Sequence, residues 1–360
     1  WFDLNKENSS FNYSYNYQNW YPSVEFETKN TRKNIGLYDL TAFSKYDLKG
    51  ENAHIDLQKI CTANIKNEIG KITYTQMLNE DGGIEADLTV ACLDQNHFRI
   101  ITSAANRERD KFHISKYLSS EVELEDITER VACFGIFGPN SRGLMKKLSN
   151  EGFSDENFKF GTGKKIKIKD KNIWAQRLSY VGELGWELYT DINHSKEIYN
   201  FIIQKGKEFK ISNCGMLSMD TMRMESGFLH WGHDISPEEN QYEAGLDFTI
   251  SYKKKIDFIG KKALLKIKEK KQKKKLITLS LEKSEPGKPL LLHDEPIYLD
   301  EKIIGRTTSG NYSFNYNKNL SFGYVNTDNT LKELRSKNLF IEVEKKKYKA
   351  KIEINPLNKS

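Results

Sequence analysis

The sequence predicts a mixed α and β (α+β) protein of several domains. Its 360 residues exceed what one hydrophobic core usually supports, so two or three domains are expected. Segments with the alternation of strands and segments with the spacing of amphipathic helices follow one another in mixed order. The run KEKKQKKK at residues 268–275 separates this mixed part from a C-terminal part that consists of short strand patterns and turns.

Composition indicates a folded protein with many charges of both signs. Hydrophobic residues make up 38% of the chain, which allows a sizeable core, and 56 Lys and Arg nearly balance 50 Asp and Glu. No apolar run approaches the roughly 18 residues of a membrane span. The 4 cysteines lie far apart without CxxC spacing, which indicates a reducing compartment. We therefore expect no nucleic acid and no membrane as partners, and a cytoplasmic location, or the mitochondrial matrix in a eukaryote.

The mixed part opens with an aromatic and polar stretch, residues 1–20, that predicts an edge strand or an arm. The helix for which Ser212 or Asn213 is the expected N-cap carries Met216, Met219 and Met222, a stripe typical of core filling. Helices are expected over residues 25–34, 53–60, 106–118, 139–148, 195–209 and 214–227, and strands over 37–49, 97–103, 121–128 and 131–138.

A first hairpin is predicted over residues 74–90, YTQMLNEDGGIEADLTV. Two strand-like runs flank Gly82 and Gly83, and paired glycines supply the positive φ angles that a short turn needs. Apolar and polar residues alternate in the second run, so Asp87 faces away from the apolar side. Because Asp is uncommon in strands, Asp87 is either part of a solvated face or a functional carboxylate.

A second hairpin is predicted over residues 173–189, IWAQRLSYVGELGWELY, with its turn at residues 182–185. The returning run places Glu187 on the face opposite Trp186 and Leu188. This pattern is compatible with a surface glutamate and with a ligand contact.

The C-terminal part, residues 275–360, predicts a small β-barrel or sandwich. The lysine run before it is a natural domain boundary, either a solvated loop or a segment that steers anions. Its strand patterns cover residues 276–281, 296–299, 302–306, 320–325 and 339–347.

Motifs for several other chemistries are incomplete. The GTGK at residues 161–164 lacks the first glycine and the Ser or Thr of a phosphate-binding loop, and no GxGxxG follows a strand. His230 and His233 flank Trp231, but a metal site would need further ligands, so no metal is predicted.

Four segments together resemble a known family. They are YTQMLNEDGGIEADLTV, ISNCGMLSMDTMRMESGF, YVGELGWELY and GRTTSGNYSFNYNKNLSFGYV. They are similar to the aminomethyltransferase (T-protein) of the glycine cleavage system and to the C-terminal half of dimethylglycine and sarcosine dehydrogenases. The opening NWYPSVEFETKNTRKNIGLYDLTAFSKYDLKG and the EAGLDF at residues 243–248 resemble the dehydrogenases most.

The resemblance implies an aminomethyltransferase-like fold in which tetrahydrofolate enters a central channel. Asp87 matches the family's acidic residue at the reactive nitrogens of the folate, where a base accepts a proton. Glu187 matches the glutamate that binds the pterin, and Tyr180 and Tyr74 are candidates for ring-stacking or hydroxyl contacts. Arg223 matches a family arginine, although pairing with Glu225 or Asp220 is an equal alternative.

The resemblance also divides the chain. It implies an arm or linker at residues 1–22, a folate-binding region at 23–267 made of two interleaved subdomains, and the barrel at 275–360. In the dehydrogenases an oxidase portion with FAD precedes this region, and it has no counterpart here. We expect such a flavin oxidase portion as a partner, in cis or in trans.

Met219 occupies a position where the T-protein carries an arginine, four residues before Arg223. Its absence, and less strongly Ala86 in place of a second Asp, favours capture of a one-carbon unit made by an oxidase. The expected function is formation of 5,10-methylenetetrahydrofolate from the product of N-demethylation, with a small-molecule one-carbon donor. The alternatives are a stand-alone aminomethyl- or methyltransferase and a folate-binding or docking module without catalysis.

Overall fold

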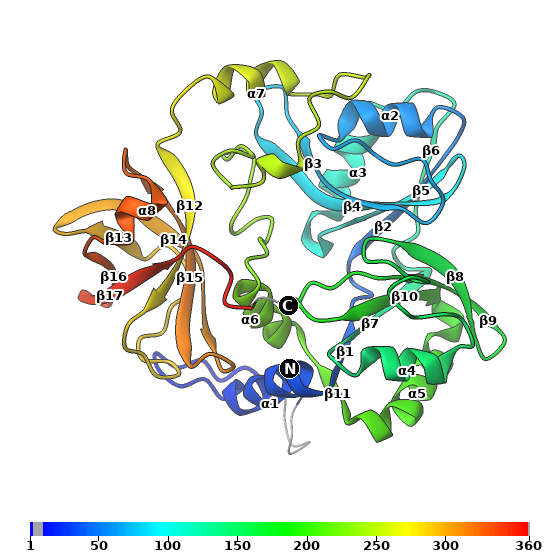
Figure 1. Cartoon of the computed structure of the whole chain (residues 1–360), viewed down its shortest axis with the longest axis horizontal. Coiled ribbons are helices and arrows are strands. Elements are labelled where there is room, and N and C mark those ends of the chain that lie inside the picture. Colours follow the sequence, from blue (N-terminus) through cyan, green and yellow to red (C-terminus); the bar gives the residue numbers. More distant parts are fainter. Residues whose placement is uncertain (3–9, 359–360) are drawn as a thin grey trace.

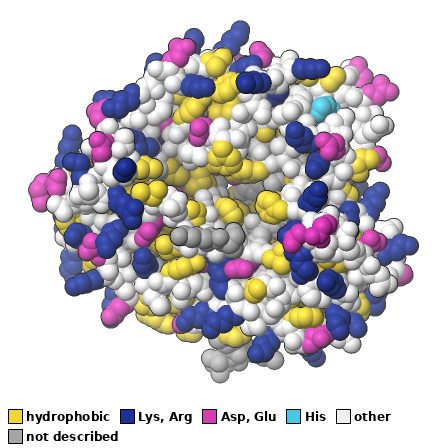
Figure 2. All heavy atoms as spheres, viewed as in Figure 1, with side chains coloured by type: hydrophobic (Ala, Val, Ile, Leu, Met, Phe, Trp, Pro, Cys, Tyr) yellow, Lys and Arg dark blue, Asp and Glu magenta, His cyan; other side chains and the backbone are white. Residues whose placement is uncertain are grey.

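The computed structural model describes residues 1–2 and 10–358, so part of the predicted arm, residues 3–9, lies outside the described residues. Three lobes surround a common centre (Figure 1). Two lobes are built on open sheets and the third is a barrel. The space-filling view shows a hollow near the middle of the same face, with hydrophobic side chains around it (Figure 2).

The first lobe contains a six-stranded sheet whose core includes Trp186 and Leu188. The strand order is β11 (Ile211–Cys214), β1 (Ile35–Asp39), β7 (Val131–Phe137), β10 (Gly185–Asp191), β9 (Lys171–Gln176) and β8 (Gly163–Ile168). Its helices are α1 (Tyr21–Lys33), α4 (Ser141–Leu148), η2 (Ile192–His194), α5 (Ser195–Gly206) and η3 (Lys207–Phe209).

The second lobe contains a five-stranded sheet with a separate core. The strand order is β3 (Ile72–Leu78), β4 (Ile84–Asp94), β5 (His97–Thr102), β2 (Ser44–Lys49) and β6 (Glu123–Asp126). Its helices are α2 (Ala53–Ile60), η1 (Ala104–Asn106) and α3 (Arg107–Ser115). Helix α6 (Met216–Glu225), η4 (Asp247–Thr249) and α7 (Lys261–Lys268) follow β11 of the first lobe in the chain and precede the barrel.

The third lobe is a closed barrel, which decides between the barrel and the sandwich that the sequence allowed. Its strands, in order around the barrel, are β12 (Lys274–Leu281), β15 (Lys318–Asn326), β14 (Lys302–Ser313), β13 (Pro296–Leu299), β16 (Leu339–Val343) and β17 (Lys346–Glu353), and it carries the short helix α8 (Leu331–Leu334). The structure thus confirms a mixed α and β fold with a C-terminal barrel.

Several local predictions were wrong. The expected strand at residues 37–49 is divided between two sheets, as β1 and β2, and the expected strand at 339–347 is the hairpin of β16 and β17. Helix α6 is capped by Gly215, because Ser212 and Asn213 belong to β11. Residues 10–20 form no strand; Trp1, Phe11 and Trp20 pack there as an aromatic cluster. Of the methionine stripe, Met219 and Met222 are buried and Met216 is 51% exposed.

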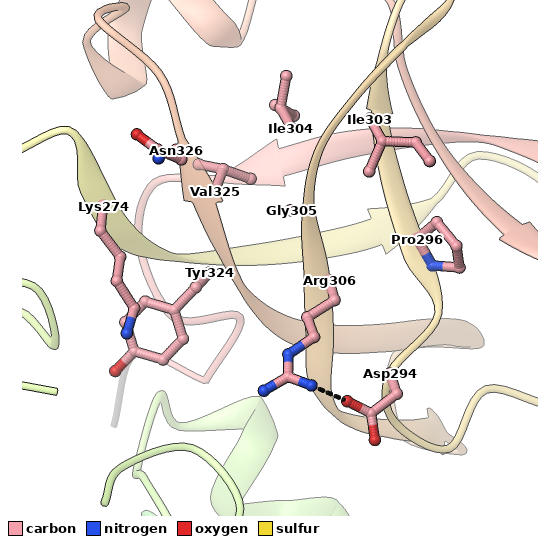
Figure 3. Close-up of a pocket in the computed structure, with 10 residues that line it drawn as sticks. All are labelled: Lys274, Asp294, Pro296, Ile303, Ile304, Gly305, Arg306, Tyr324, Val325 and Asn326. Carbon is pink, nitrogen blue, oxygen red and sulfur yellow. Dashed lines mark hydrogen bonds and ion pairs between the residues drawn. The ribbon is translucent and has the colours of Figure 1, made fainter. Parts of the chain in front are cut away.

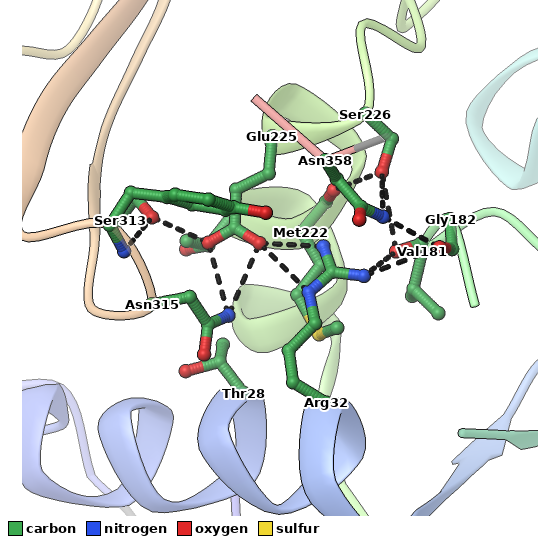
Figure 4. Close-up of polar contacts among 12 residues, drawn as sticks. Thr28, Arg32, Val181, Gly182, Met222, Glu225, Ser226, Ser313, Asn315 and Asn358 are labelled. Atoms are coloured by element: carbon green, nitrogen blue, oxygen red, sulfur yellow. Dashed lines mark hydrogen bonds and ion pairs between the residues drawn. The ribbon is translucent and has the colours of Figure 1, made fainter. Parts of the chain in front are cut away.

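One polar cluster connects the first lobe, α6 and the barrel (Figure 4). Arg32 of α1 donates to both Glu225 of α6 at 2.6 Å and the carbonyl of Val181 at 2.8 Å. The other oxygen of Glu225 accepts from Ser313 of the barrel at 2.6 Å and from Asn315 at 3.2 Å. The side chain of Glu225 is 0% exposed, so its charge depends on these partners.

Within the described residues, none of the helices combines the length and apolarity needed to cross a membrane. The four cysteines are buried and free.

Candidate functional site

Asp87 lies on β4, in the hairpin predicted from the sequence. Burial alternates along β4 from Ile84 to Val90, as the pattern predicts, and Asp87 projects from the face opposite the core of the second lobe. The glycines of the turn have different roles. Gly82 has the expected positive φ of 90°, whereas Gly83 is required because a Cβ there would lie 2.0 Å from the carbonyl oxygen of Pro237.

Two side chains of β3 hold the Asp87 carboxyl group. Gln76 pairs with Asp87 across the ladder and donates its amide to Oδ1 at 2.7 Å. The Tyr74 hydroxyl also hydrogen-bonds to Asp87. Burial raises the pKa of Asp87 to about 6, although the hydrogen bonds from Gln76 and Tyr74 act to lower it. Asp87 can therefore exchange a proton near neutral pH.

Tyr74 has accessible surface in the interior of the molecule. Its side chain is 38% exposed, yet burial among protein atoms is the main cause that raises its pKa well above the usual value, followed by the Asp87 charge. A side chain that is accessible to solvent although protein atoms surround it is typical of the wall of a channel.

Tyr180 lies in the loop between β9 and β10, since the predicted tight turn is a longer loop over residues 177–184. Its ring stacks on Phe228 with 5.9 Å between centroids, and its hydroxyl donates to the carbonyl of Leu229. Burial raises the pKa of Tyr180, and the charge of Asp87 acts in the same direction. Tyr74, Asp87 and Tyr180 therefore lie close together.

Glu187 lies on β10, and its face of the first sheet also carries Tyr189. The Tyr189 hydroxyl donates to Oε2 at 2.6 Å, and burial raises the pKa of Glu187. Oε1 has no hydrogen bond to any residue that the structure describes. Tyr189 packs with Ala91 and Leu93, which share the Asp87 face of β4. The two carboxylates thus project from sheet faces that pack against each other, without touching.

Gln176 is a polar residue that the sequence reasoning did not single out. It lies opposite Glu187 in the ladder of β9 and β10 and is 0% exposed. Neither amide atom has a hydrogen-bond partner within the described part of the chain. A buried amide without partners lowers the stability of the fold, so this residue is a candidate for a role other than packing.

We expect Gln176→Met to raise the free energy of unfolding by about 1 kcal/mol, because the change removes an unpaired buried amide at similar volume. Urea unfolding of the unliganded protein measures this. The matched control is Gln58→Met. It removes the hydrogen bonds that the Gln58 amide donates to Asn64 and to the carbonyl of Ile65, so it is expected to lower stability. A loss of stability in Gln176→Met would contradict the expectation.

Arg223 lies on α6 with its side chain 2% exposed. It donates to Asp220 at 2.9 Å, to Asp234 at 2.6 Å and to Ser309 of the barrel at 2.8 Å. Of the two partners that the sequence offered, Asp220 pairs with Arg223, whereas Glu225 pairs with Arg32. The charge of Arg223 acts on Tyr180, but its role in ligand binding stays a prediction.

Gln76 is a partner of Asp87 that the sequence analysis did not single out. Alternation within 74–90 puts it on the Tyr74 face, which was a usable signal. Its pairing with Asp87 was harder to infer, because a bulge between Met77 and Leu78 shifts the register next to the turn.

A separate hollow of about 470 Å³ lies in the barrel surface (Figure 3). It is lined by Ile303, Val325 and Tyr324 among others, and its Arg306 is paired with Asp294 at 2.9 Å. None of the residues predicted for the site lies there. Volume alone therefore does not point to Asp87 and Glu187, which remain candidates because their pKa values are raised and they lie on sheet faces that pack together.

Comparison with known proteins identifies both parts of the chain. Residues 5–254 match the GCVT N-terminal domain, and residues 274–359 match the glycine cleavage T-protein C-terminal barrel domain. A solved aminomethyltransferase T of the glycine cleavage system from Bartonella henselae has the same fold. Its TM-score is 0.84 at 21% identity, over 98% of this chain and 95% of that one.

Curated relatives are of two kinds. Mitochondrial dimethylglycine dehydrogenase of Rattus norvegicus is 34% identical over 90% of this chain and 38% of its own length. The 4-methylaminobutanoate oxidase (formaldehyde-forming) of Paenarthrobacter nicotinovorans is 31% identical over 99% of this chain and 42% of its own. Aminomethyltransferase of Halothermothrix orenii is 32% identical over 86% of this chain and 85% of its own. The chain thus spans less than half of the dehydrogenase and oxidase but most of the aminomethyltransferase, and it belongs to the glycine cleavage T-protein (aminomethyltransferase) family.

Proposed function

We propose that the chain is a tetrahydrofolate-dependent one-carbon transfer module, which forms 5,10-methylenetetrahydrofolate from the product of an N-demethylation. The observation that supports it most is Asp87, a half-buried carboxyl group whose pKa of about 6 suits a base at neutral pH. Membership of the T-protein family agrees with this chemistry.

The proposed folate site consists of residues with complementary tasks. Tetrahydrofolate would supply a nucleophilic amine, and Asp87 accepts the proton that this amine loses. Glu187 accepts pterin N–H groups, because its Oε1 receives no donor from the described residues and Tyr189 orients Oε2. Tyr74 and Tyr180 provide ring surfaces beside Asp87, and Arg223 fixes the loop that carries Phe228.

Residues 23–267 would form the folate-binding region, with residues 275–360 as the barrel and 1–22 as the arm. The identity to a dimethylglycine dehydrogenase and to a formaldehyde-forming oxidase favours a dehydrogenase-like enzyme. Its FAD would belong to an oxidase portion outside this chain. Met219, in place of the arginine expected for a T-protein, favours the same assignment.

A second candidate is a stand-alone aminomethyl- or methyltransferase. It is favoured by the match over 85% of an aminomethyltransferase from Halothermothrix orenii.

The function is tested by adding tetrahydrofolate and formaldehyde to the purified chain. Tetrahydrofolate binding is followed by calorimetry and product formation by absorbance, corrected for the reaction without protein. Saturable binding with accelerated product formation supports the proposal. Absence of binding overturns it, and binding without acceleration identifies a folate-binding module.

We expect Glu187→Gln to weaken tetrahydrofolate binding by roughly 10- to 100-fold, because a charge-assisted acceptor is lost. Calorimetry measures the Kd. The control is Glu197→Gln, an exposed glutamate paired with Lys169 on the outside of the first lobe. Equal affinity of Glu187→Gln and the unmodified chain would exclude Glu187 as the pterin contact.

A further inference from the structure

Asp87 is the end of a chain of buried amide groups. Gln76 donates Nε2 to Oδ1 of Asp87 at 2.7 Å, and Gln241 donates Nε2 to Oε1 of Gln76 at 2.7 Å. Both glutamines are 0% exposed. A loop residue far along the sequence is therefore connected to the candidate base through one intermediate side chain.

Two hydroxyl groups lie beside these amides, and the Thr249 hydroxyl can also donate to the carbonyl of Leu246 at 2.6 Å. Gln241 is held through its Nε2 atom, since its Oε1 atom has no hydrogen-bond partner among the described residues. The Thr249 hydroxyl lies 2.6 Å from Oε1 of Gln76, and Gln241 Nε2 lies 2.7 Å from Thr249 and 3.1 Å from Thr62. If the Gln76 amide turned over, its oxygen would face the Asp87 carboxylate and its nitrogen would face the Gln241 nitrogen. Both contacts are repulsive, so Gln76 presents an N–H group to Asp87 as long as Gln241 keeps its position.

This orientation distinguishes the two oxygens of Asp87. In a protonated carboxyl group the carbonyl oxygen accepts hydrogen bonds better than the hydroxyl oxygen does. A fixed N–H donor on Oδ1 therefore favours Oδ1 as the carbonyl oxygen and leaves Oδ2 to carry the proton. The same donor stabilises the ionised form, in opposition to burial.

We propose that Gln241, supported by Thr249, is a positioning residue that acts through Gln76 to keep Asp87 ionised in the free protein and to direct the incoming proton to Oδ2. The inference rests on the proposed role of Asp87 as the base. The amine lone pair forms the bond to the electrophilic carbon of formaldehyde or an iminium, while the C=O or C=N π bond breaks and its electron pair moves to the oxygen or to the iminium nitrogen. The N–H bond then breaks, its electron pair stays on nitrogen, and the proton forms the new bond to Oδ2.

The test is the titration of the Asp87 carboxyl carbon by NMR in the unliganded protein. Gln76→Leu removes the donor on Oδ1, and Gln241→Leu frees the Gln76 amide to turn. Each is expected to raise the pKa of Asp87 by about one unit. Because Gln241 acts only through Gln76, Gln241→Leu is expected to add nothing in the Gln76→Leu background. In the pH profile of kcat/KM for product formation, the apparent pKa of the acid limb should rise by the same amount.

The control is Gln58→Leu. Gln58 is a buried glutamine of α2, and its side-chain amide donates hydrogen bonds to Asn64 and to the carbonyl of Ile65. This substitution is expected to change stability but not the pKa of Asp87. If Gln241→Leu does not fold, Thr249→Val should raise the pKa of Asp87 and Thr249→Ser, which keeps the hydroxyl, should not.

The inference is overturned if Gln241→Leu leaves the pKa of Asp87 within about 0.2 units. An equal shift with and without Gln76 also overturns it. The titration needs no folate, so its outcome is independent of the assay for function. If the pKa of Asp87 shifts in Gln241→Leu but Asp87→Asn keeps full activity, Asp87 is not the base. The proposed transfer of the proton to Oδ2 would then be overturned as well.

Discussion

Asp87→Asn is expected to lower the rate of methylenetetrahydrofolate formation by roughly 10²- to 10⁴-fold, with little change in tetrahydrofolate affinity. The amide keeps the shape of the side chain but accepts no proton. In the unmodified chain, kcat/KM should rise as the pH passes through about 6, where Asp87 ionises, and the residual activity of Asp87→Asn should lack this rise. Steady-state kinetics between pH 5 and 8 measure both effects.

Loss of folding would not explain this result. The pKa of Asp87 in the folded protein, about 6, exceeds its ordinary value of 3.8, so ionisation destabilises the fold as the pH rises between these values. The amide carries no charge, and Asp87→Asn is therefore expected to be at least as stable at pH 7. Asp81→Asn, in the exposed turn of the same hairpin, is the control with unchanged activity. An unchanged rate in Asp87→Asn would exclude Asp87 as the base.

Arg32→Met is expected to lower the free energy of unfolding by about 3 to 5 kcal/mol, because it leaves a buried carboxylate without its cation. The side chain of Glu225 is 0% exposed, and Arg32 donates hydrogen bonds to it through Nε and Nη2. The third nitrogen of Arg32, Nη1, donates to the carbonyl of Val181 and to the carboxylate of Glu183. The cluster joins α1, α6, the β9–β10 loop and the barrel (Figure 4). Urea unfolding measures the loss.

The control for Arg32→Met lies on the same helix. Lys29 pairs with Glu25, but their side chains are 43% and 40% exposed, so Lys29→Met should change stability by no more than about 0.5 kcal/mol. Adding Glu225→Gln to Arg32→Met should recover part of the loss, because the uncompensated charge is removed. Equal effects of Arg32→Met and Lys29→Met would show that the cluster does not stabilise the assembly of lobes.

Local patterns determined much of the fold. Residues 53–60 form the predicted helix α2, and the hairpin at 74–90 has the predicted alternation, with Asp87 away from the core. These features follow from short-range rules, because side-chain periodicity and turn glycines act within a few residues. Resemblance to a known family then led to the prediction that Asp87 and Glu187 share a ligand, which periodicity alone did not suggest.

Tertiary structure decided what surrounds those carboxylates. The sequence allowed Asp87 to lie either on a solvated strand face or in a functional site. These two environments differ in the contacts of Asp87, which come from Gln76 across the ladder and from sheet faces of different lobes that pack together. Gln241 and Arg32 carry no local signal, because their partners lie 165 and 193 positions away in the chain. Burial and long-range pairing set the pKa of Asp87 and the charge balance of Glu225, and neither is a property of a short segment.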